Sequence, residues 1–137
     1  MVDLKRRKTG KANRAAGKRF ERKVEQDLEN NGWIVIRFAK QVDIEQNKLI
    51  NPKPFFNFST KSISYAGTGF PDLLIINGSG ITKDGPVFFI KLIECKINGM
   101  LDKEEKAKAE WIKNNLKIPI EVASRGEKRG EIKYTVV

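Results

Sequence analysis

The chain has 137 residues, 39% of them hydrophobic, which is enough for one compact domain with a buried core. It carries 27 Lys and Arg residues against 17 Asp and Glu residues, and a net charge of +10 indicates a polyanionic partner, most commonly nucleic acid. The absence of histidine excludes Ser-His-Asp and Cys-His catalysis and most zinc sites, whereas hard-metal chemistry on carboxylates stays possible.

The sequence also bears on the compartment. A single cysteine excludes an internal disulfide, and no apolar stretch is long enough to span a membrane. The basic N-terminus lacks the apolar region of a signal peptide. We therefore expect a cytoplasmic protein, or one in the host-cell cytoplasm if the chain is viral, with no membrane partner.

Two segments are predicted before the first strand. Residues 1–14 form a basic arm, expected to be flexible, that either contacts phosphates or is simply a solvated terminus. Residues 15–31 are predicted to be a helix, which ends at the stop signal of residues 30–32 and opens the single folded domain, 15–137. Apolar residues recur every four positions along this helix. They are Ala16, Phe20, Val24 and Leu28.

Two acids on this helix are in unusual positions. Asp27 falls inside the apolar stripe and Glu21 lies at its border, so either side chain could face the sheet. The alternative is ordinary surface charge, with Glu21 paired to neighbours on the same helix.

A β-branched and aromatic strand is predicted over residues 33–39, followed by an insertion or long loop over 40–68. One short strand is expected within this insertion, near residues 61–65. A cluster of Phe55, Phe56 and Phe58 lies in it beside Lys53 and Lys61. Such a cluster usually packs a loop onto the body, and the alternative is stacking on unpaired bases.

The second half of the chain predicts strands at 73–76 and 87–97, with turns at 77–80 and 83–86. Lys91 interrupts the second strand, which suggests a bulge or an opening in the cover of the sheet. A helix over 102–116 with Asp102 as its N-cap follows, then strands at 119–123 and 132–136 around a basic turn. The order α-β-(insert)-β-β-α-β-β predicts a single α/β domain with a central mixed sheet flanked by helices.

Charged residues stand at the ends of two apolar strands. Asp72 opens one strand, and Glu94 and Lys96 end the next on the same face, because residues two apart in a strand share a face. Two carboxylates, with the Cys95 backbone carbonyl, make an oxygen-rich site for Mg²⁺. Lys96 beside it is suited to orienting a water and stabilising a phosphorus transition state. If each feature is taken alone, Asp72 could be an ordinary acid in a turn, and Glu94 with Lys96 could be a salt bridge at a strand end.

These residues carry a resemblance. The pattern Pro71-Asp72 followed by Glu94-Cys95-Lys96 resembles the PD-(D/E)XK nuclease superfamily, which has a restriction-endonuclease-like fold. Residues 17–22 and 31–37 are similar to the opening of archaeal Holliday-junction resolvases. Residues 69–72, 94–96 and 101–105 are similar to VRR-NUC nucleases. The insertion at 40–68 departs from the resolvases, and Glu105 stands near the position where VRR-NUC relatives often carry a glutamine.

The resemblance implies a Mg²⁺-dependent DNA endonuclease in which Mn²⁺ can substitute for Mg²⁺. It adds Glu21 to the metal site, so that Glu21, Asp72, Glu94 and Lys96 form the catalytic set. It further implies a homodimer that cuts branched DNA such as Holliday junctions. The alternatives are another structure-selective or restriction-like nuclease, an RNA-processing nuclease, and a non-catalytic nucleic-acid-binding module.

The predicted DNA contacts come from the arm, the first helix and the C-terminal turn, because these segments concentrate the basic charge. They are Lys5, Arg6, Arg7, Lys8, Lys11, Arg14, Lys18, Arg19, Arg22, Arg125, Lys128 and Arg129.

Overall fold

The computed structural model describes residues 3–52, 54–65 and 69–137. Its elements follow the order α1 (Asp3–Asn30), β1 (Ile34–Arg37), β2 (Gln41–Asp43), β3 (Lys48–Ile50), β4 (Pro54–Asn57), β5 (Ser62–Tyr65), β6 (Leu73–Thr82), β7 (Gly85–Cys95), α2 (Lys103–Asn115), β8 (Ile120–Arg125) and β9 (Ile132–Val136). Five strands form one sheet in the order β1-β6-β7-β8-β9, in which only β7 and β8 run parallel. The predicted mixed sheet with two helices is confirmed.

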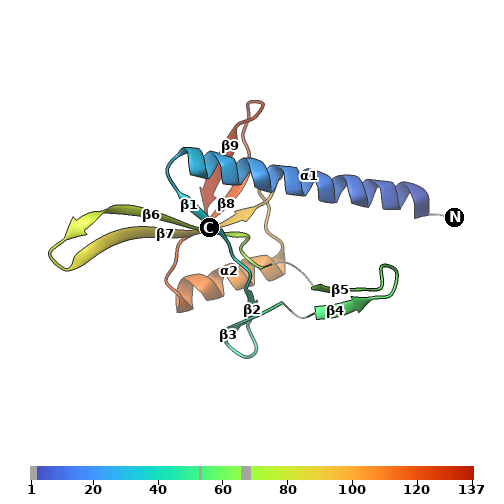
Figure 1. Ribbon diagram of the computed structural model, residues 1–137, viewed down its shortest axis with the longest axis horizontal. Helices are drawn as coiled ribbons and strands as arrows, with labels where there is room; N and C mark the ends of the chain where they lie inside the picture. The colour runs from blue at the N-terminus through green and yellow to red at the C-terminus, as the bar shows by residue number, and fades with distance from the viewer. Residues whose placement is uncertain (1–2, 53, 66–68) are drawn as a thin grey trace.

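The two helices cover opposite faces of this sheet (Figure 1). On one face, Phe20, Val24 and Leu28 of α1 pack against a cluster that includes Leu73 and Ile93. Each of these buried side chains contributes on the order of 2 kcal/mol of hydrophobic stabilisation. The four-residue spacing of the stripe therefore positions α1 across the sheet.

The other face packs against α2, where Ala109 and Ile112 meet Leu92 and Ile120. The predicted N-cap is confirmed. The Asp102 carboxylate accepts a hydrogen bond from the Glu105 amide at 2.8 Å, and the Glu105 carboxylate accepts one from the Asp102 amide at 3.1 Å. This reciprocal capping box fixes the start of α2 and, with it, the position of the Glu105 side chain.

Helix α1 begins at Asp3, so the predicted start at residue 15 is wrong. Residues 3–14 contain no proline and are rich in Lys and Arg, which favour helix, and nothing between residues 14 and 15 stops one. The N-terminal half of α1 extends beyond the sheet in Figure 1. The basic segment predicted as a separate arm is thus, from Asp3 onward, a continuation of the helix.

The insertion at 40–68 contains two hairpins, β2–β3 and β4–β5. Strand β5 confirms the short strand expected near 61–65, but the other three strands were not predicted. Val42 of β2 is buried in the α2-side core, so the first hairpin belongs to the body. The expectation that the phenylalanines pack the loop onto the body is wrong for Phe56 and Phe58, whose side chains are 50% and 85% exposed. Lys53 and the side chain of Phe55 lie outside the described residues.

A turn predicted at 77–80 is instead part of β6, which continues to Thr82 with a bulge between Gly78 and Gly80. Gly78 pairs with Phe88 of β7, and a Cβ at Gly78 would make an ordinary van der Waals contact with the Phe88 ring at 3.5 Å. Lys91 sits in regular pairing with Ile75, so neither strand bulges there. Its ammonium lies 3.3 Å from a Glu121 carboxylate oxygen.

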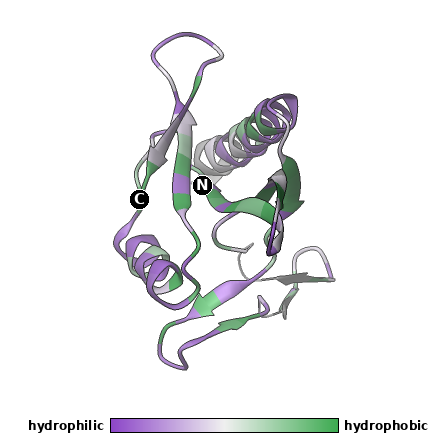
Figure 2. Cartoon of the chain, turned by 90° about the vertical axis from the view of Figure 1, so that its left-hand side faces the viewer, coloured by the Kyte–Doolittle hydropathy of each residue, from purple (hydrophilic) through white to green (hydrophobic). Residues whose placement is uncertain are grey.

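Within the described ranges, no helix is long and apolar enough to cross a membrane. Figure 2 shows the strands of the sheet coloured largely hydrophobic, whereas α1 and α2 are mainly hydrophilic in colour.

Candidate active site

The start of β6 meets the end of β7, because these antiparallel strands pair Leu73 with Ile93. This register places Asp72 beside Glu94. The Asp72 carboxylate accepts a hydrogen bond from the Cys95 amide at 2.9 Å, and the Glu94 carboxylate accepts one from the Asp72 amide at 3.2 Å. The crossed bonds hold both acids at the ends of neighbouring strands, as the sequence predicts.

The segment before Asp72 is fixed against the end of β1. The Phe38 amide donates to the Asp72 carbonyl at 2.9 Å, and the Phe70 amide donates to the Lys40 carbonyl at 2.8 Å. A Cβ at Gly69 would come within 1.6 Å of the Phe38 carbonyl oxygen, so only glycine fits there. This close backbone approach positions the Asp72 side chain.

Burial dominates the electrostatics of the two acids. Burial and then the charge of Asp72 raise the pKa of Glu94 to about 9, and burial also raises the pKa of Asp72. The negative charge of Asp72 thus favours the protonated form of Glu94. The site therefore has more acidic groups than its own cations neutralise.

Lys96 lies on the same face as Glu94, but its ammonium contacts Glu105 of α2 at 2.7 Å. Burial by itself would lower the pKa of Lys96, yet the hydrogen bond and charge of Glu105, together with the charges of Glu94 and Asp102, raise it. Lys96 is therefore a cation at neutral pH. As placed here, it is suited to stabilising negative charge rather than to accepting a proton.

These groups open into a cavity of about 320 Å³ between the strand ends and the start of α2. Its lining residues are Gln41, Gly69, Phe70, Asp72, Glu94, Lys96, Asp102, Glu104, Glu105 and Lys108. Sequence reasoning missed Gln41 and Lys108, whose side chains hydrogen-bond to each other at 3.2 Å. It noted Glu105 as a departure from the VRR-NUC pattern but assigned it no contact with Lys96, although the capping-box spacing from Asp102 was a usable signal for its position.

Glu21 is not among the residues that line this cavity. It lies on the α1 side, where its carboxylate is 4.0 Å from the Arg37 guanidinium. Burial and the charge of Asp72 raise the pKa of Glu21, so the two acids interact electrostatically. Its place as a metal ligand stays a prediction. Asp27, the other inward candidate, accepts a hydrogen bond from the Tyr134 hydroxyl at 2.6 Å and belongs to the packing of α1.

Cys95 contributes through its backbone. Its amide faces Asp72, and the N–H and C=O of one strand residue point to the same side, so its carbonyl faces the same edge. Burial and the charge of Asp72 raise the pKa of the Cys95 thiol, which makes the sulfur unreactive.

The donor set suits a hard divalent cation. The pKa values of the buried Glu94 and the half-buried Asp72 are both raised, so a cation would replace the proton that this site favours. Mg²⁺ retains waters and needs few protein ligands. Among the described residues, however, no three Asp, Glu, Cys or His side chains are grouped as a complete metal site. Asp72 and Glu94, with the Cys95 carbonyl, are thus the residues that would hold the ion.

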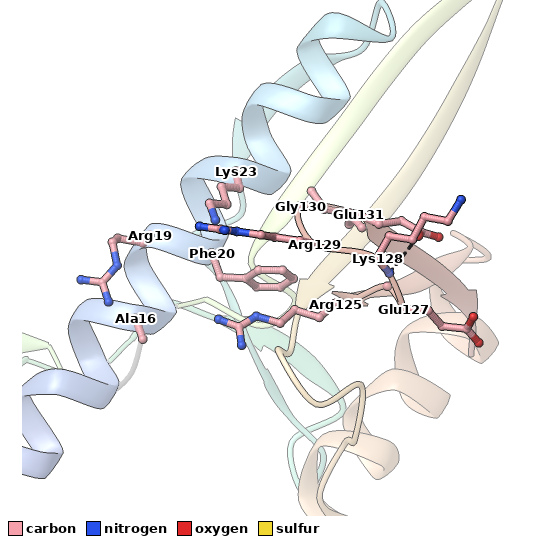
Figure 3. Close-up of a pocket in the computed structure, with 12 residues that line it drawn as sticks. Ala16, Arg19, Phe20, Lys23, Arg125, Glu127, Lys128, Arg129, Gly130 and Glu131 are labelled. Atoms are coloured by element: carbon pink, nitrogen blue, oxygen red, sulfur yellow. Dashed lines mark hydrogen bonds between the residues drawn. The ribbon is translucent and has the colours of Figure 1, made fainter.

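A second, basic cleft of about 400 Å³ lies where α1 meets the β8–β9 turn. Figure 3 shows Arg19 and Lys23 of α1 on one side and Arg125 and Arg129 on the other. The backbone joins this cleft to the end of β7, since the Arg125 amide donates to the Ile97 carbonyl at 3.2 Å. The structure therefore brings together predicted DNA contacts from both ends of the chain, with Lys128, and adds Lys23.

The remaining basic residues of α1 form a separate outer ridge. Lys11, Arg14, Lys18 and Arg22 are exposed and recur every three or four positions, opposite the buried stripe. The side chains of Lys5, Arg6, Arg7 and Lys8 lie outside the described residues. The predicted contacts thus divide between an inner cleft and an outer ridge.

Comparison with known proteins adds no relative: no family model, no curated protein and no solved structure matches the chain.

Proposed function

We propose that this protein is a Mg²⁺-dependent endodeoxyribonuclease of the PD-(D/E)XK type with a restriction-endonuclease-like fold. The observation that carries the proposal is the pair of crossed hydrogen bonds that holds Asp72 and Glu94 together, with Lys96 in the same cavity. A structural salt bridge would place opposite charges together. Here two acids adjoin instead, at a cost that a metal ion would offset.

Each residue has a role that follows from its position. Asp72, Glu94 and the Cys95 carbonyl would hold Mg²⁺, and Mn²⁺ is expected to substitute because it takes the same oxygen ligands. When bound, such an ion supplies electrophilic activation of a phosphate and of a water molecule. The Lys96 ammonium stabilises negative charge on the phosphate oxygens, and the basic cleft and ridge bind the flanking backbone.

The test measures cleavage and binding separately. Glu94→Ala and Lys96→Ala are each expected to abolish Mg²⁺-dependent cleavage of labelled DNA while leaving DNA binding largely intact. Exposed Lys83→Ala, remote from the cavity, is the control and should cleave as the wild type does. Full cleavage by Glu94→Ala would refute the proposal.

Branched DNA such as a Holliday junction is the proposed substrate, and other structure-selective or restriction-like cleavage is the alternative. Four-way junction, flap, single-stranded and linear duplex DNA offered with Mg²⁺ separate these options. Symmetrical nicks across the junction support a dimeric resolvase, and a parallel RNA series tests for an RNA-processing enzyme.

A non-catalytic nucleic-acid-binding module is the second candidate. One observation in its favour is that Lys96, the lysine that catalysis would use, is already paired with Glu105. Another is that the described residues contain no group of three side chains that could hold a metal ion. Salt-sensitive binding of DNA or RNA without cleavage in Mg²⁺ or Mn²⁺ would establish this candidate.

The proposed homodimer is supported by an apolar surface, the open sheet face, formed by Ile34, Ile36, Ile76, Phe88 and Ile90. Ile34, Ile76 and Ile90 lie in one row across β1, β6 and β7, on the same face as the buried Leu92. A second copy of the chain would cover the part of this face that is left exposed.

A further inference from the structure

The β4–β5 hairpin carries exposed aromatic side chains on one face. Phe56 and Phe58 lie two residues apart, and their rings meet edge to face with centroids 5.0 Å apart. Ile63 pairs with Phe56 across the hairpin and is 68% exposed. These described side chains remain in water, so this face of the hairpin does not serve the core of the protein.

The turn that ends the hairpin is ordered by its own contacts. The Ser59 amide donates to the Asn57 side chain at 3.0 Å, and the Thr60 and Ser62 hydroxyls are 2.7 Å apart. Exposed Lys61 adopts a positive φ of 50° in this turn, close to Phe58 in sequence. The tip therefore presents an aromatic ring and a cation on a turn that holds its own shape.

Chain length keeps the base of this hairpin, at Tyr65, near the candidate active site. Tyr65 ends β5 and Gly69 lines the cavity, and a chain of this separation spans at most about 15 Å when fully extended. Figure 1 shows the hairpin and the N-terminal half of α1 extending to the same side of the sheet. In this view α1 lies above and the hairpin lies below. A strand that leaves the cavity toward this side of the sheet would thus approach the hairpin.

We propose that Phe56 and Phe58 form a stacking platform for unpaired nucleotides that flank the phosphate bound at Asp72 and Glu94, with Lys61 contacting the backbone. The chemistry selects this ligand because an exposed ring beside a cation suits a base next to its phosphate. Paired bases inside a duplex do not expose their faces. The substrate class is therefore DNA with a single-stranded stretch flanking the cleavage point, such as a flap, a gap or an open junction. This inference rests on the proposed function for its position, but its test does not require cleavage.

The experiment measures binding in EDTA, so that catalysis plays no part. The full chain is titrated with a fluorescent single-stranded oligonucleotide, a gapped duplex and a blunt duplex of equal length. Phe58→Ala is expected to weaken binding of the first two by about tenfold, the scale of one lost base–aromatic stack. The blunt duplex should show no such loss.

Three further variants distinguish stacking from simple apolar docking. Phe58→Trp should restore binding, and Phe58→Leu should not, because leucine keeps apolar volume without an aromatic face. Ile81→Ala is the matched control, since Ile81 is 86% exposed at the end of β6 and Phe58 is 85% exposed. It should bind all three probes as the wild type does.

Each remaining outcome would overturn the inference. It fails if Phe58→Leu binds as well as the wild type, if Phe58→Ala loses the blunt duplex equally, or if all variants bind alike. It also fails if Phe58→Ala dissociates a dimer in sedimentation, because the hairpin would then be a protein contact. Loss of single-strand binding by a protein that never cleaves would refute the nuclease and leave the stacking platform standing.

Discussion

The raised pKa of Glu94 makes the free energy of unfolding depend on pH. Its folded-state pKa of about 9 lies above its ordinary value of 4.5, so the folded chain holds a proton that the unfolded chain releases. The resulting stabilisation is present at low pH and is lost as pH rises through the folded pKa. The acids that would bind a metal are therefore expected to destabilise the metal-free protein at alkaline pH.

The first prediction follows from this sign. In EDTA, the free energy of unfolding should fall by on the order of 3 kcal/mol between pH 6 and pH 9, because one extra proton is bound by the folded state. Urea unfolding at both values measures it. Glu94→Gln should flatten this dependence, and Mg²⁺ should stabilise the wild type more at pH 9 than at pH 6. An equally steep dependence in Glu94→Gln would contradict the assignment.

The second prediction concerns the ion pair of Lys96 with Glu105. Glutamine can replace glutamate in a capping box, so Glu105→Gln should keep α2 intact while removing the charge that raises the pKa of Lys96. In an active enzyme, the basic limb of the pH–rate profile should move to lower pH, because Lys96 then loses its proton more easily. An unmoved limb would show that Lys96 does not set it. Glu110→Gln, on the exposed part of α2, is the control.

At the level of whole elements, α1 presents basic charge in two directions, and the cleft with the β8–β9 turn is the one joined to the active-site edge. We predict that Arg125→Gln with Arg129→Gln makes the negative slope of log binding constant against log salt concentration shallower by about 2, one unit for each lost phosphate contact. Fluorescence anisotropy across a salt series measures the slope. Lys83→Gln with Lys117→Gln removes the same charge elsewhere and should leave it unchanged. Equal slopes in both double variants would exclude the cleft as a DNA contact.

The elements also show what local sequence can specify. The four-residue stripe of α1 and the Asp102–Glu105 capping box were predictable, because each depends on residues within a few turns of one helix. Strands β2, β3 and β4 were not, because strands this short are specified by their pairing partner more than by their composition. The residues at 77–80 look like a turn, and only their pairing with Phe88 and Phe89 of β7 shows that a strand passes through them.

The candidate site divides in the same way. Asp72, Glu94 and Lys96 were predictable as neighbours, because strand ends and a period of two determine their positions. The contact of Lys96 with Glu105 was not, since it depends on how α2 packs against the sheet. The direction of the Glu21 side chain also depends on the rotation of α1 about its axis. The position of Glu21 at the border of the apolar stripe does not determine that rotation.

The sheet extends beyond α2, and the part of its face that α2 does not cover is exposed. Leu92 is fully buried, whereas Ile90, Phe88 and Ile34 on the same face are 42%, 56% and 62% exposed. Their exposed side-chain area is on the order of 300 Å², comparable to the largest patch on a typical monomer. A standard interface buries about 800 Å² per partner, so the open sheet face would form the apolar centre of one.

We therefore predict that the open sheet face mediates dimerisation. Phe88→Lys with Ile90→Lys should convert a dimer to a monomer, because the symmetric contact would bring four ammonium groups into an apolar interface. Sedimentation velocity measures the change, and circular dichroism checks that the fold survives, which the exposure of both side chains favours. Ile81→Lys, at the end of β6, should remain dimeric. A monomeric wild type, or a double variant that remains dimeric, would contradict this prediction. Either result would remove the structural basis proposed for the paired cleavage of two strands.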